Sequence, residues 1–227
     1  MSLVAAGLSS DANLQGYWKL DGNFNDSSPN SYTLTNSGAT SVSGLFDGGY
    51  DFELADPDYA TIADASCANL EISGSQSWVI WVKQETITSY QDPMVKAKAD
   101  GSIIHGLTTS ADANSFVYFT LTGLTTNSQV AGGTGTVGQW HHIAGVYDSS
   151  AGKLRVYLDG VKVGEVTAGG TATDTDGDFS LGRNGSAGNT YFDGVLDEAA
   201  VFNRALTDAE ILSIFKAGRG TRTAWFM

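Results

Sequence analysis

Short stretches in which apolar and polar residues alternate recur along the whole chain. Glycine, asparagine, aspartate or serine bounds each stretch, which is the pattern of β-strands that bury one face. We expect strands at residues 14–20, 50–54, 59–62, 78–82, 103–107, 116–121, 141–147, 154–158 and 179–181. No helical pattern separates these strands, so the chain is predicted to form an all-β sandwich or barrel.

The clearest turn signal lies in the second half of the chain. Asp159 and Gly160 stand between two apolar-alternating runs, and glycine tolerates the positive φ that a two-residue hairpin turn requires. A slightly longer turn, rich in serine and glycine, precedes them at residues 148–152. Residues 140–166 are therefore predicted to form a three-stranded meander.

One helix is predicted, near the C-terminus. Residues 192–202 alternate like a strand, and the pattern then changes at Thr207, which together with Glu210 fits the capping box of a helix N-terminus. An apolar stripe follows at Ile211, Leu212 and Phe215. Gly218 is expected to end the helix, because glycine is favoured just after the last turn.

Composition is consistent with one large β domain. The chain has 227 residues, with 28 glycines and only three prolines, as expected where many tight turns join strands. No linker or internal repeat is evident, so residues 14–218 are read as one sandwich and residues 219–227 as a tail. No apolar run reaches the roughly 18 residues of a membrane span. The first residues lack a basic segment, so no intact signal peptide is predicted.

The charge balance narrows the classes of partner. Twenty-five acidic residues against 12 basic ones give a net charge of −13, which repels phosphate backbones and argues against nucleic acid. Neutral polysaccharide, protein and metal ions remain as partners. The single cysteine, Cys67, cannot form an internal disulfide and is read as an ordinary half-buried thiol.

Three motifs match known functional sequence patterns, but the residues around them do not provide the structural context that each function requires. Residues 133–138 fit the dinucleotide fingerprint, yet a strand-like run follows where a helix is required, so a glycine loop is predicted. His141 and His142 are adjacent on a strand and point to opposite faces, and with only His105 besides, a zinc site is not expected. One of the pair is expected to pack inside. Residues 174–178 resemble part of a calcium loop but lack its outer ligands, which favours a solvated turn.

No catalytic constellation is found. The six glutamates are not arranged as the paired carboxylates of sandwich glucanases, and no nucleophile elbow is present. We therefore expect a non-catalytic protein.

A metal site with oxygen ligands is better supported, because residues 21–30 concentrate carboxylate and amide side chains in one loop after the first strand. Such a loop suits Ca²⁺, and it equally suits a turn stabilised by Asp, Asn and Ser.

The ordered set of motifs resembles the laminin-G-like jelly roll of the concanavalin A-like lectin/glucanase superfamily. The resemblance rests on strings such as GYWKLDGNFNDSS at the first strand, GQWHHIAGVYD and LRVYLDG in the meander, and NRALTDAEI at the helix. It covers residues 14–218, and residues 86–137 match least well. It implies two curved antiparallel sheets packed face to face, with one short C-terminal helix.

The resemblance also implies a structural calcium ion near the sheet edge. In the family, acids of the opening strand and loop and the aspartate of the penultimate strand hold the ion. The matching positions are Asp21 and Asp197, with Asp26 as a further candidate and backbone carbonyls, for example around Gly44, as additional ligands. The ion would fasten the first strand to the last.

Most domains of this family are non-catalytic modules of secreted or cell-surface bacterial proteins, and they bind carbohydrate or protein. The resemblance therefore favours a glycan-binding module of a larger multidomain protein. The alternatives are a protein-interaction or adhesion domain and, less favoured, a glycoside hydrolase or lyase. Aromatic and planar polar side chains suit sugar binding, although each can instead belong to the core. Those that lie in or near predicted loops are Tyr90, Asn114, Tyr118, Arg183, Asn184 and Tyr191.

Overall fold

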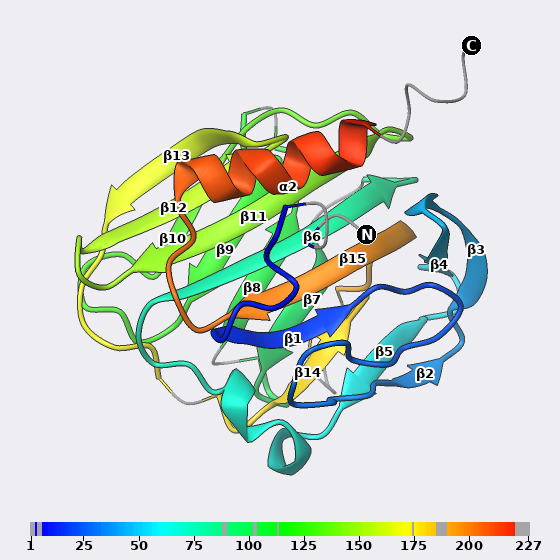
Figure 1. The fold of residues 1–227 in the computed structure, drawn as a ribbon, viewed down its shortest axis with the longest axis horizontal. Coiled ribbons are helices and arrows are strands. Elements are labelled where there is room, and N and C mark those ends of the chain that lie inside the picture. Colours follow the sequence, from blue (N-terminus) through cyan, green and yellow to red (C-terminus); the bar gives the residue numbers. More distant parts are fainter. Residues whose placement is uncertain are drawn as a thin grey trace.

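Two antiparallel sheets pack face to face (Figure 1). The structure, a computed structural model, describes residues 3, 6–87, 90–101, 104–112, 114–173, 175–184 and 190–220. The eight-stranded sheet has the order β13 (Val161–Thr167), β12 (Lys153–Leu158), β11 (Trp140–Asp148), β6 (Gln76–Gln84), β15 (Gly194–Phe202), β4 (Gly48–Phe52) and β3 (Thr40–Phe46), and β1 (Leu14–Trp18) also pairs with β15. The predicted jelly-roll sandwich is confirmed.

The second sheet lies behind the first in Figure 1. Its strand order is β10 (Gln129–Gly132), β9 (Val117–Leu121), β8 (Ile104–Thr109), β7 (Gln91–Ala97), β14 (Asp178–Leu181), β5 (Tyr59–Ile62) and β2 (Thr35–Ser37). Two short 3-10 helices, η1 (Asp64–Ser66) and η2 (Ala68–Leu70), connect β5 to β6. We refer to the sheets as the eight-stranded and the seven-stranded sheet.

Alternate residues of both sheets fill the space between them. Trp18 stacks on Phe179 of the opposite sheet with ring centroids 4.6 Å apart, and both side chains are fully buried. Gly145 on β11 makes room for Phe119, because a Cβ at this glycine would lie 2.1 Å from that ring. The aromatic ring of Phe119 thus fills the space that a side chain at position 145 would occupy, and the core is closely packed.

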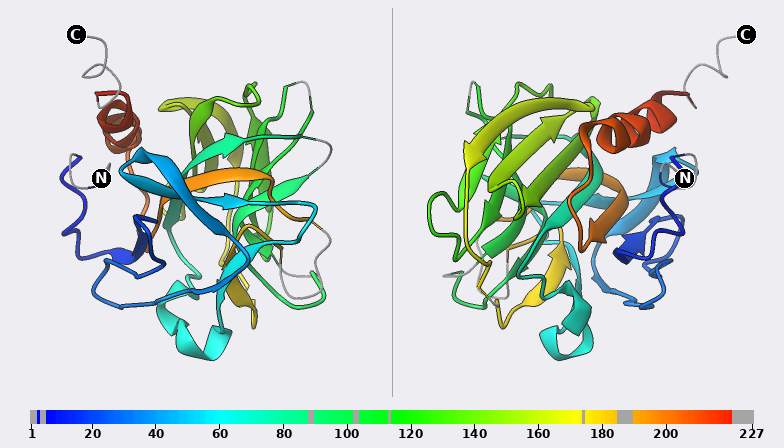
Figure 2. Two further views of the ribbon diagram at one scale, coloured as in Figure 1. Left: turned by 90° about the vertical axis from the view of Figure 1, so that its right-hand side faces the viewer. Right: turned by 60° about the vertical axis from the view of Figure 1, so that its left-hand side comes forward.

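A second, smaller core covers the outer face of the eight-stranded sheet. The helix α2 (Asp208–Gly220) lies on this face, away from the other sheet (Figures 1 and 2). Ile211 and Ile214 of the helix are buried with Tyr157 and Ala200 of the sheet. Leu8 also belongs to this core, so packing extends to residues before position 14.

The capping box at the helix start is confirmed. The Thr207 N–H donates to Glu210 Oε2 at 2.8 Å, and the Glu210 N–H donates to Thr207 Oγ1 at 3.2 Å. The predicted end of the helix was wrong, because α2 continues past Gly218 to Gly220. A Cβ at position 218 would lie 2.2 Å from the indole ring of Trp81, so this glycine allows close packing rather than ending the helix. Residues 221–227 of the predicted tail lie outside the described residues.

The meander and its turn are confirmed. Strands β11, β12 and β13 are neighbours, and Asp159 and Gly160 have φ values of 51° and 78°, as a two-residue hairpin requires. His142 is fully buried, whereas the His141 side chain is 12% exposed and its Nδ1 lies 2.9 Å from Asp159 Oδ2. The glycines at 133–138 connect β10 to β11 as a loop.

Four strands were not predicted from the alternation pattern: β2, β3, β7 and β10. The central strand β7 contains Pro93, which cannot donate to a neighbour, and its register with β8 shifts between Gln91 and Met94. It also carries Lys96, which is fully buried and pairs with Asp64 and Glu71, each at 2.5 Å. Cys67 is fully buried rather than half-buried, and burial raises the pKa of its thiol.

Candidate functional site

A bulge in β15 sets the position of Asp197. Asp197 lies opposite Trp81 of β6 and Ala200 opposite Val79, so β15 carries one extra residue, and Glu198 has a φ of 54°. Leu196 faces the core between the sheets, so its neighbour Asp197 turns to the other face. The bulge thus directs a carboxylate toward residues 44–48, where β3 ends and β4 begins, and we call this segment the turn between β3 and β4.

The carboxylate of Asp197 is only half satisfied. Its Oδ2 accepts hydrogen bonds from the backbone N–H groups of Leu45 and Phe46, both at 2.9 Å. Its Oδ1 is buried and has no hydrogen-bond partner. Burial raises the pKa of Asp197 to about 8, the negative charge of Glu198 adds to this effect, and the two N–H groups lower the pKa. This carboxylate therefore needs a proton or a cation at Oδ1.

Asp21 also contacts the backbone of this turn. Its Oδ1 accepts a hydrogen bond from the Gly48 N–H at 3.1 Å. A Cβ at Gly44 would lie 2.7 Å from Asp197 Oδ2 and 1.8 Å from the Gly48 carbonyl oxygen, and one at Gly48 would lie 3.0 Å from the Asp21 Cα. Asp21 and Asp197, the two metal ligands that the family resemblance implies, therefore both accept hydrogen bonds from the backbone of this turn.

Backbone strain is concentrated around this turn. Leu20, Asp47 and Glu198 have φ values of 62°, 49° and 54°, and they are half of the six non-glycine residues with positive φ in the described chain. Each such conformation costs on the order of 1–3 kcal/mol and persists where the surroundings enforce it. Strain, an orphaned carboxylate oxygen and two converging acids mark this region as a candidate metal site.

The residues present fit a hard cation with oxygen ligands. Ca²⁺ accepts carboxylates, backbone carbonyls and water. Among the described residues, no group of three or more His, Cys, Asp or Glu side chains converges as a metal site. Carbonyl groups of the turn and water would therefore complete the coordination of an ion held by Asp21 and Asp197.

Asp26 has a different environment. Its Oδ1 accepts from the N–H groups of Tyr17 and Ser28, both at 2.7 Å. Its Oδ2 accepts from the Ser28 hydroxyl at 2.7 Å and from the Tyr32 N–H at 2.8 Å. Four donors thus occupy the two oxygens, and Asp26 fastens the loop after β1 to that strand, as expected for an aspartate-stabilised turn.

A second group of polar residues lies on the outer face of the seven-stranded sheet. Leu107 and Phe119 face the core, so their neighbours Thr108 and Tyr118, which are paired across β8 and β9, face outward. Asp92 of β7 is 2% exposed and accepts hydrogen bonds from the hydroxyl groups of Thr108, at 2.5 Å, and of Thr190. Burial raises the pKa of Asp92, and these hydroxyl groups lower it.

Two tyrosines lie on the same face, and Tyr118 is the cross-strand neighbour of Thr108. Tyr90 is 49% exposed and meets Tyr118 edge to face, with ring centroids 5.3 Å apart. The Tyr118 hydroxyl donates to Asp112 Oδ2 at 2.5 Å, which raises the pKa of Tyr118 to about 12. The pair offers an aromatic surface next to polar groups.

The segment after β14 completes the group. Arg183 forms a backbone bridge with Tyr191, and its guanidinium carbon lies 3.6 Å from the ring centroid of Tyr59. The Asn184 side chain faces Asp92 and helps to lower the pKa of that carboxyl. We call Tyr59, Tyr90, Asp92, Thr108, Tyr118, Arg183, Asn184 and Tyr191 the outer-face cluster.

The structure brings most of the predicted ligand residues together in this cluster. Tyr90, Tyr118, Arg183, Asn184 and Tyr191 belong to it, whereas Asn114 is exposed in the turn between β8 and β9. Sequence reasoning missed Asp92, Thr108 and Tyr59. Asp92 and Thr108 lie within residues 86–137, where the family resemblance is weakest.

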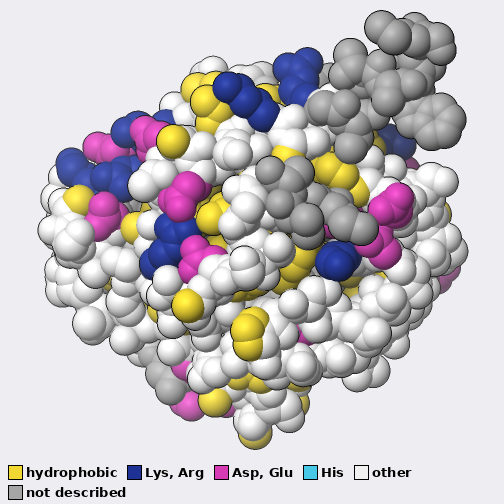
Figure 3. Space-filling model, in the orientation of Figure 1, with side chains coloured by type: hydrophobic (Ala, Val, Ile, Leu, Met, Phe, Trp, Pro, Cys, Tyr) yellow, Lys and Arg dark blue, Asp and Glu magenta, His cyan; other side chains and the backbone are white. Residues whose placement is uncertain are grey.

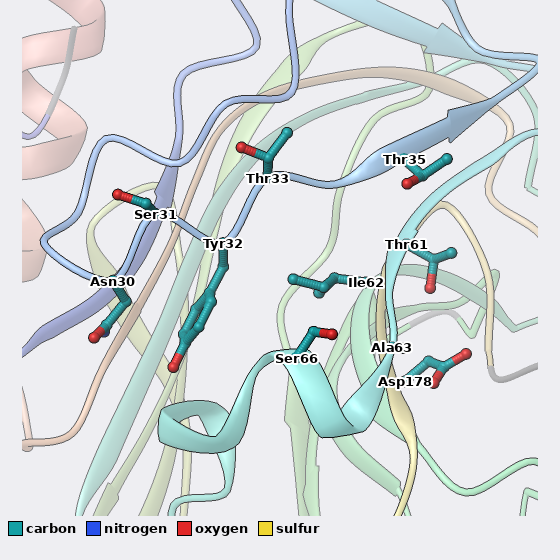
Figure 4. Close-up of a pocket in the computed structure, with 10 residues that line it drawn as sticks. All are labelled: Asn30, Ser31, Tyr32, Thr33, Thr35, Thr61, Ile62, Ala63, Ser66 and Asp178. Carbon is teal, nitrogen blue, oxygen red and sulfur yellow. The ribbon is translucent and has the colours of Figure 1, made fainter.

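A separate hollow of about 740 Å³ lies beside β2 and β5 (Figure 4). The loop that carries Tyr32 and Thr33 forms one wall, and β5 with η1 forms the other. Hydroxyl groups dominate its lining, and Asp178 adds a carboxylate. Such a hollow could hydrogen-bond a polar ligand, but the sequence did not indicate it.

The face that carries α2 has a mixed charge (Figure 3). Arg155 of β12 binds Glu165 at 2.9 Å and Asp148 at 3.4 Å, and Lys162 binds Glu165 at 2.8 Å. Charges of both signs therefore neutralise one another over β12 and β13. No helix in the described parts of the chain is long and apolar enough to cross a membrane.

Comparison with known proteins agrees with this architecture. The laminin-G model described as "Concanavalin A-like lectin/glucanases superfamily" matches residues 54–212. A search of curated proteins found no match.

Solved structures with the same fold come from larger proteins. Domain 4 of the extracellular arabinanase AbnA from Geobacillus stearothermophilus, solved with arabinotriose, has a TM-score of 0.65 at 19% identity, covering 89% of this chain and 98% of that one. The binding domain of Paraclostridial Mosquitocidal Protein 1 has a TM-score of 0.67 at 12% identity, covering 89% and 52%. Trypanosoma rangeli sialidase has a TM-score of 0.66 at 17% identity, covering 91% and 33%. At these identities the similarity concerns the fold.

Proposed function

Because the chain belongs to the concanavalin A-like lectin/glucanase superfamily, we propose that it is a non-catalytic carbohydrate-binding module. The outer-face cluster is the observation that carries this proposal. Tyr90, which is half exposed, contacts the largely buried Tyr118 edge to face, and this pair shares one sheet face with a carboxylate, an amide and a guanidinium group. Sugar rings stack on aromatic faces, and their hydroxyl groups bond to planar polar side chains.

The cluster can position a sugar without attacking it. Asp92 is 2% exposed and is engaged by two hydroxyl donors, and Asp112 accepts from Tyr118. Glycoside hydrolysis needs one carboxyl group to donate a proton and a second to act as base or nucleophile. Carboxylates bound in this way favour recognition over hydrolysis. An assay for new reducing ends with the same glycans tests the hydrolase alternative, and turnover would overturn the non-catalytic proposal.

The proposal includes a structural Ca²⁺ ion held by Asp21, Asp197 and carbonyl groups of the turn between β3 and β4. When bound, the ion would supply positive charge at the orphaned Oδ1 of Asp197. The two aspartates come from the loop after β1 and from β15, and both already bond to the backbone of this turn. Their role would be to fasten three segments that are distant in sequence.

The protein is further proposed to act outside the cell, as part of a longer polypeptide. The chain spans about half of the mosquitocidal binding domain and a third of the sialidase, so folds of this kind occur beside other domains. The arabinanase is described as extracellular, and its matching domain was solved with arabinotriose. These similarities support a glycan as the partner.

Binding of soluble polysaccharides tests the proposal. Isothermal titration with arabinan, xylan, mixed-linkage glucan and pectin should detect saturable binding of at least one glycan. Tyr90→Ala and Tyr118→Ala should each weaken it by about tenfold, because a lost stacking contact removes on the order of 1 kcal/mol. Tyr32→Ala is the matched control, since Tyr32 lines the separate hollow.

The outcomes separate the alternatives. If Tyr32→Ala abolishes binding and Tyr118→Ala does not, the hollow in Figure 4 is the glycan site. If no glycan binds, the carbohydrate proposal fails. A protein-interaction or adhesion domain would then be the better hypothesis.

A further inference from the structure

Arg183 is a buried cation without an anionic partner. It follows Gly182, whose φ of 83° turns the chain at the end of β14. Arg183 is only 8% exposed, and its guanidinium group lies over the ring of Tyr59. Neither an ion pair nor a side-chain hydrogen bond joins this group to any residue that the structure describes, and its Nε is buried without an acceptor.

Other partly buried arginines in the chain are neutralised. Arg155 binds Glu165 and Asp148, and its side chain is 18% exposed. Arg204 binds Asp11 at 2.6 Å and Glu210 at 2.7 Å, and its side chain is 25% exposed. Arg183 is more buried than either, so the lack of a carboxylate is unusual for its environment. A buried charge that is left unpaired is strongly unfavourable, and the contact with Tyr59 offsets this only in part.

The residue that follows Arg183 carries an unsatisfied acceptor. The Oδ1 of Asn184 is buried and receives no hydrogen bond, and the same side chain faces Asp92. Asp92 itself is bound by hydroxyl groups and forms no ion pair with Arg183. The cluster therefore offers a free cationic fork and a free amide oxygen on adjacent residues.

We propose that the outer-face cluster binds a glycan that carries a carboxylate, such as a uronic-acid polysaccharide. The carboxylate would accept hydrogen bonds from Arg183, whose planar fork matches carboxylate geometry, and a neighbouring sugar hydroxyl would donate to Asn184 Oδ1. This inference rests on the proposed function, since it names the class of glycan for the same site. A net charge of −13 disfavours densely charged polyanions, so the carboxylate is recognised locally at Arg183.

Two forms of one polysaccharide provide the test. De-esterified homogalacturonan carries free carboxylates, and its fully methyl-esterified form has the same backbone without the charge. Titration of the intact protein should give at least about tenfold tighter binding to the de-esterified form, the ratio expected from one charge-assisted hydrogen bond. Dextran sulfate serves as a third probe, and equal binding to it would show that any anion suffices and overturn carboxylate recognition.

Variants at Arg183 and Asn184 test whether these residues cause the preference for the free acid. Arg183→Gln should lose the preference for the free acid, and Arg183→Lys should keep only part of it, because lysine lacks the planar fork. Asn184→Asp would place a carboxylate on the residue next to Arg183, so this variant should also lose the preference for the free acid. Because the Asn184 side chain also faces the buried Asp92, circular dichroism and a thermal melt check that the variant is folded. This variant keeps the test decisive if Arg183→Gln does not fold.

The possible failures are distinct. If wild-type protein binds both forms equally, or if Arg183→Gln and Asn184→Asp keep the preference, carboxylate recognition is wrong and the glycan-binding proposal stands. If none of the neutral or acidic glycans binds, the proposed function itself fails. About tenfold weaker binding of both forms on Tyr118→Ala, together with loss of only the acid preference on Arg183→Gln, is the result that we expect.

Discussion

At the scale of single residues, Asp197 holds a carboxylate oxygen that is buried and without a donor. Two backbone N–H groups stabilise the charge at one oxygen, but burial dominates and raises the pKa of Asp197 to about 8. The folded protein without a bound cation therefore keeps this side chain protonated near neutral pH. A calcium ion would replace the proton, which links metal binding to pH.

This linkage predicts how stability depends on pH when calcium is removed. Between about pH 4 and pH 8 the folded state binds a proton at Asp197 that the unfolded state has lost. The stabilisation from this proton is fully present below the pKa of Asp197 in the unfolded chain, and it is lost as pH rises through the pKa of Asp197 in the folded protein. In a chelator, the free energy of unfolding should therefore fall by on the order of 1 kcal/mol per pH unit over this range. Urea denaturation at several pH values measures the slope.

Asp197→Asn is the control for that slope, because asparagine has a similar shape and does not titrate. The variant should show a flatter dependence in chelator, and saturating calcium should flatten the dependence of the wild-type protein. An unchanged slope in Asp197→Asn would mean that another group is responsible.

Lys96 is a residue whose charge is fully buried and paired. Asp64 and Glu71 each lie 2.5 Å from its Nζ. Lys96→Met should lower the free energy of unfolding by about 1–3 kcal/mol, since it leaves the partly exposed carboxylates of Asp64 and Glu71 without their cation. Lys153→Met is the matched control, because Lys153 is partly exposed and its nearest carboxylate is 3.7 Å away. Similar losses for both variants in urea denaturation would contradict this role of Lys96.

At the scale of elements, the turn between β3 and β4 connects the two aspartates of the candidate metal site. Its glycines are required by space, because a Cβ at Gly44 would overlap the Gly48 carbonyl at 1.8 Å. The bulge in β15 performs the complementary task by turning Asp197 toward this turn. Two irregular elements, rather than regular strands, therefore define the site.

Gly44→Ala should remove the calcium response by distorting this turn. The added methyl group would displace backbone next to Asp197 Oδ2, so the variant should be destabilised by roughly 1–3 kcal/mol and its melting temperature should no longer rise with calcium. Gly74→Ala is the matched control, since a Cβ there would meet no atom within 4 Å. A normal calcium shift in Gly44→Ala would argue that the turn does not contribute ligands.

Sequence patterns predicted those elements whose determinants are local. Asp159 and Gly160 specify a hairpin by their own backbone preferences, and Thr207 with Glu210 caps a helix within four residues. The strand β7 could not be predicted in this way, because Pro93 and Lys96 contradict a central strand. In the folded chain, a shift in the register between β7 and β8 accommodates Pro93, and the carboxylates of Asp64 and Glu71 neutralise the buried Lys96.

The same limit applies to the candidate sites. Asp21 and Asp197 were paired through the order of family motifs, although they are far apart in sequence. Asp92 was missed because its partner Thr190 lies 98 residues away and nothing near Asp92 indicates that contact. Tyr59 was missed for a related reason, since its role depends on Arg183, which stacks over its ring from the segment after β14. Only the folded sheet brings these residues together.

At the scale of the whole molecule, the candidate metal site and the outer-face cluster lie on opposite sides of the core between the sheets. Asp197 turns away from that core on the eight-stranded sheet, and Tyr118 turns away from it on the seven-stranded sheet. The two sites share no residue. Metal binding and glycan binding should therefore be separable by experiment.

Removal of calcium should lower the melting temperature and leave glycan affinity unchanged. An ion present at 100 times its dissociation constant stabilises the folded state by about 2.7 kcal/mol, which corresponds to roughly 5–10 °C for a protein of this size. Calorimetry with calcium and with EGTA measures this shift, and Asp197→Asn should show none. Glycan titration at 20 °C, where both forms are folded, should give the same dissociation constant within about twofold. If EGTA abolished glycan binding at that temperature, the ion would have to belong to the ligand site, and the separation of the two faces would be wrong.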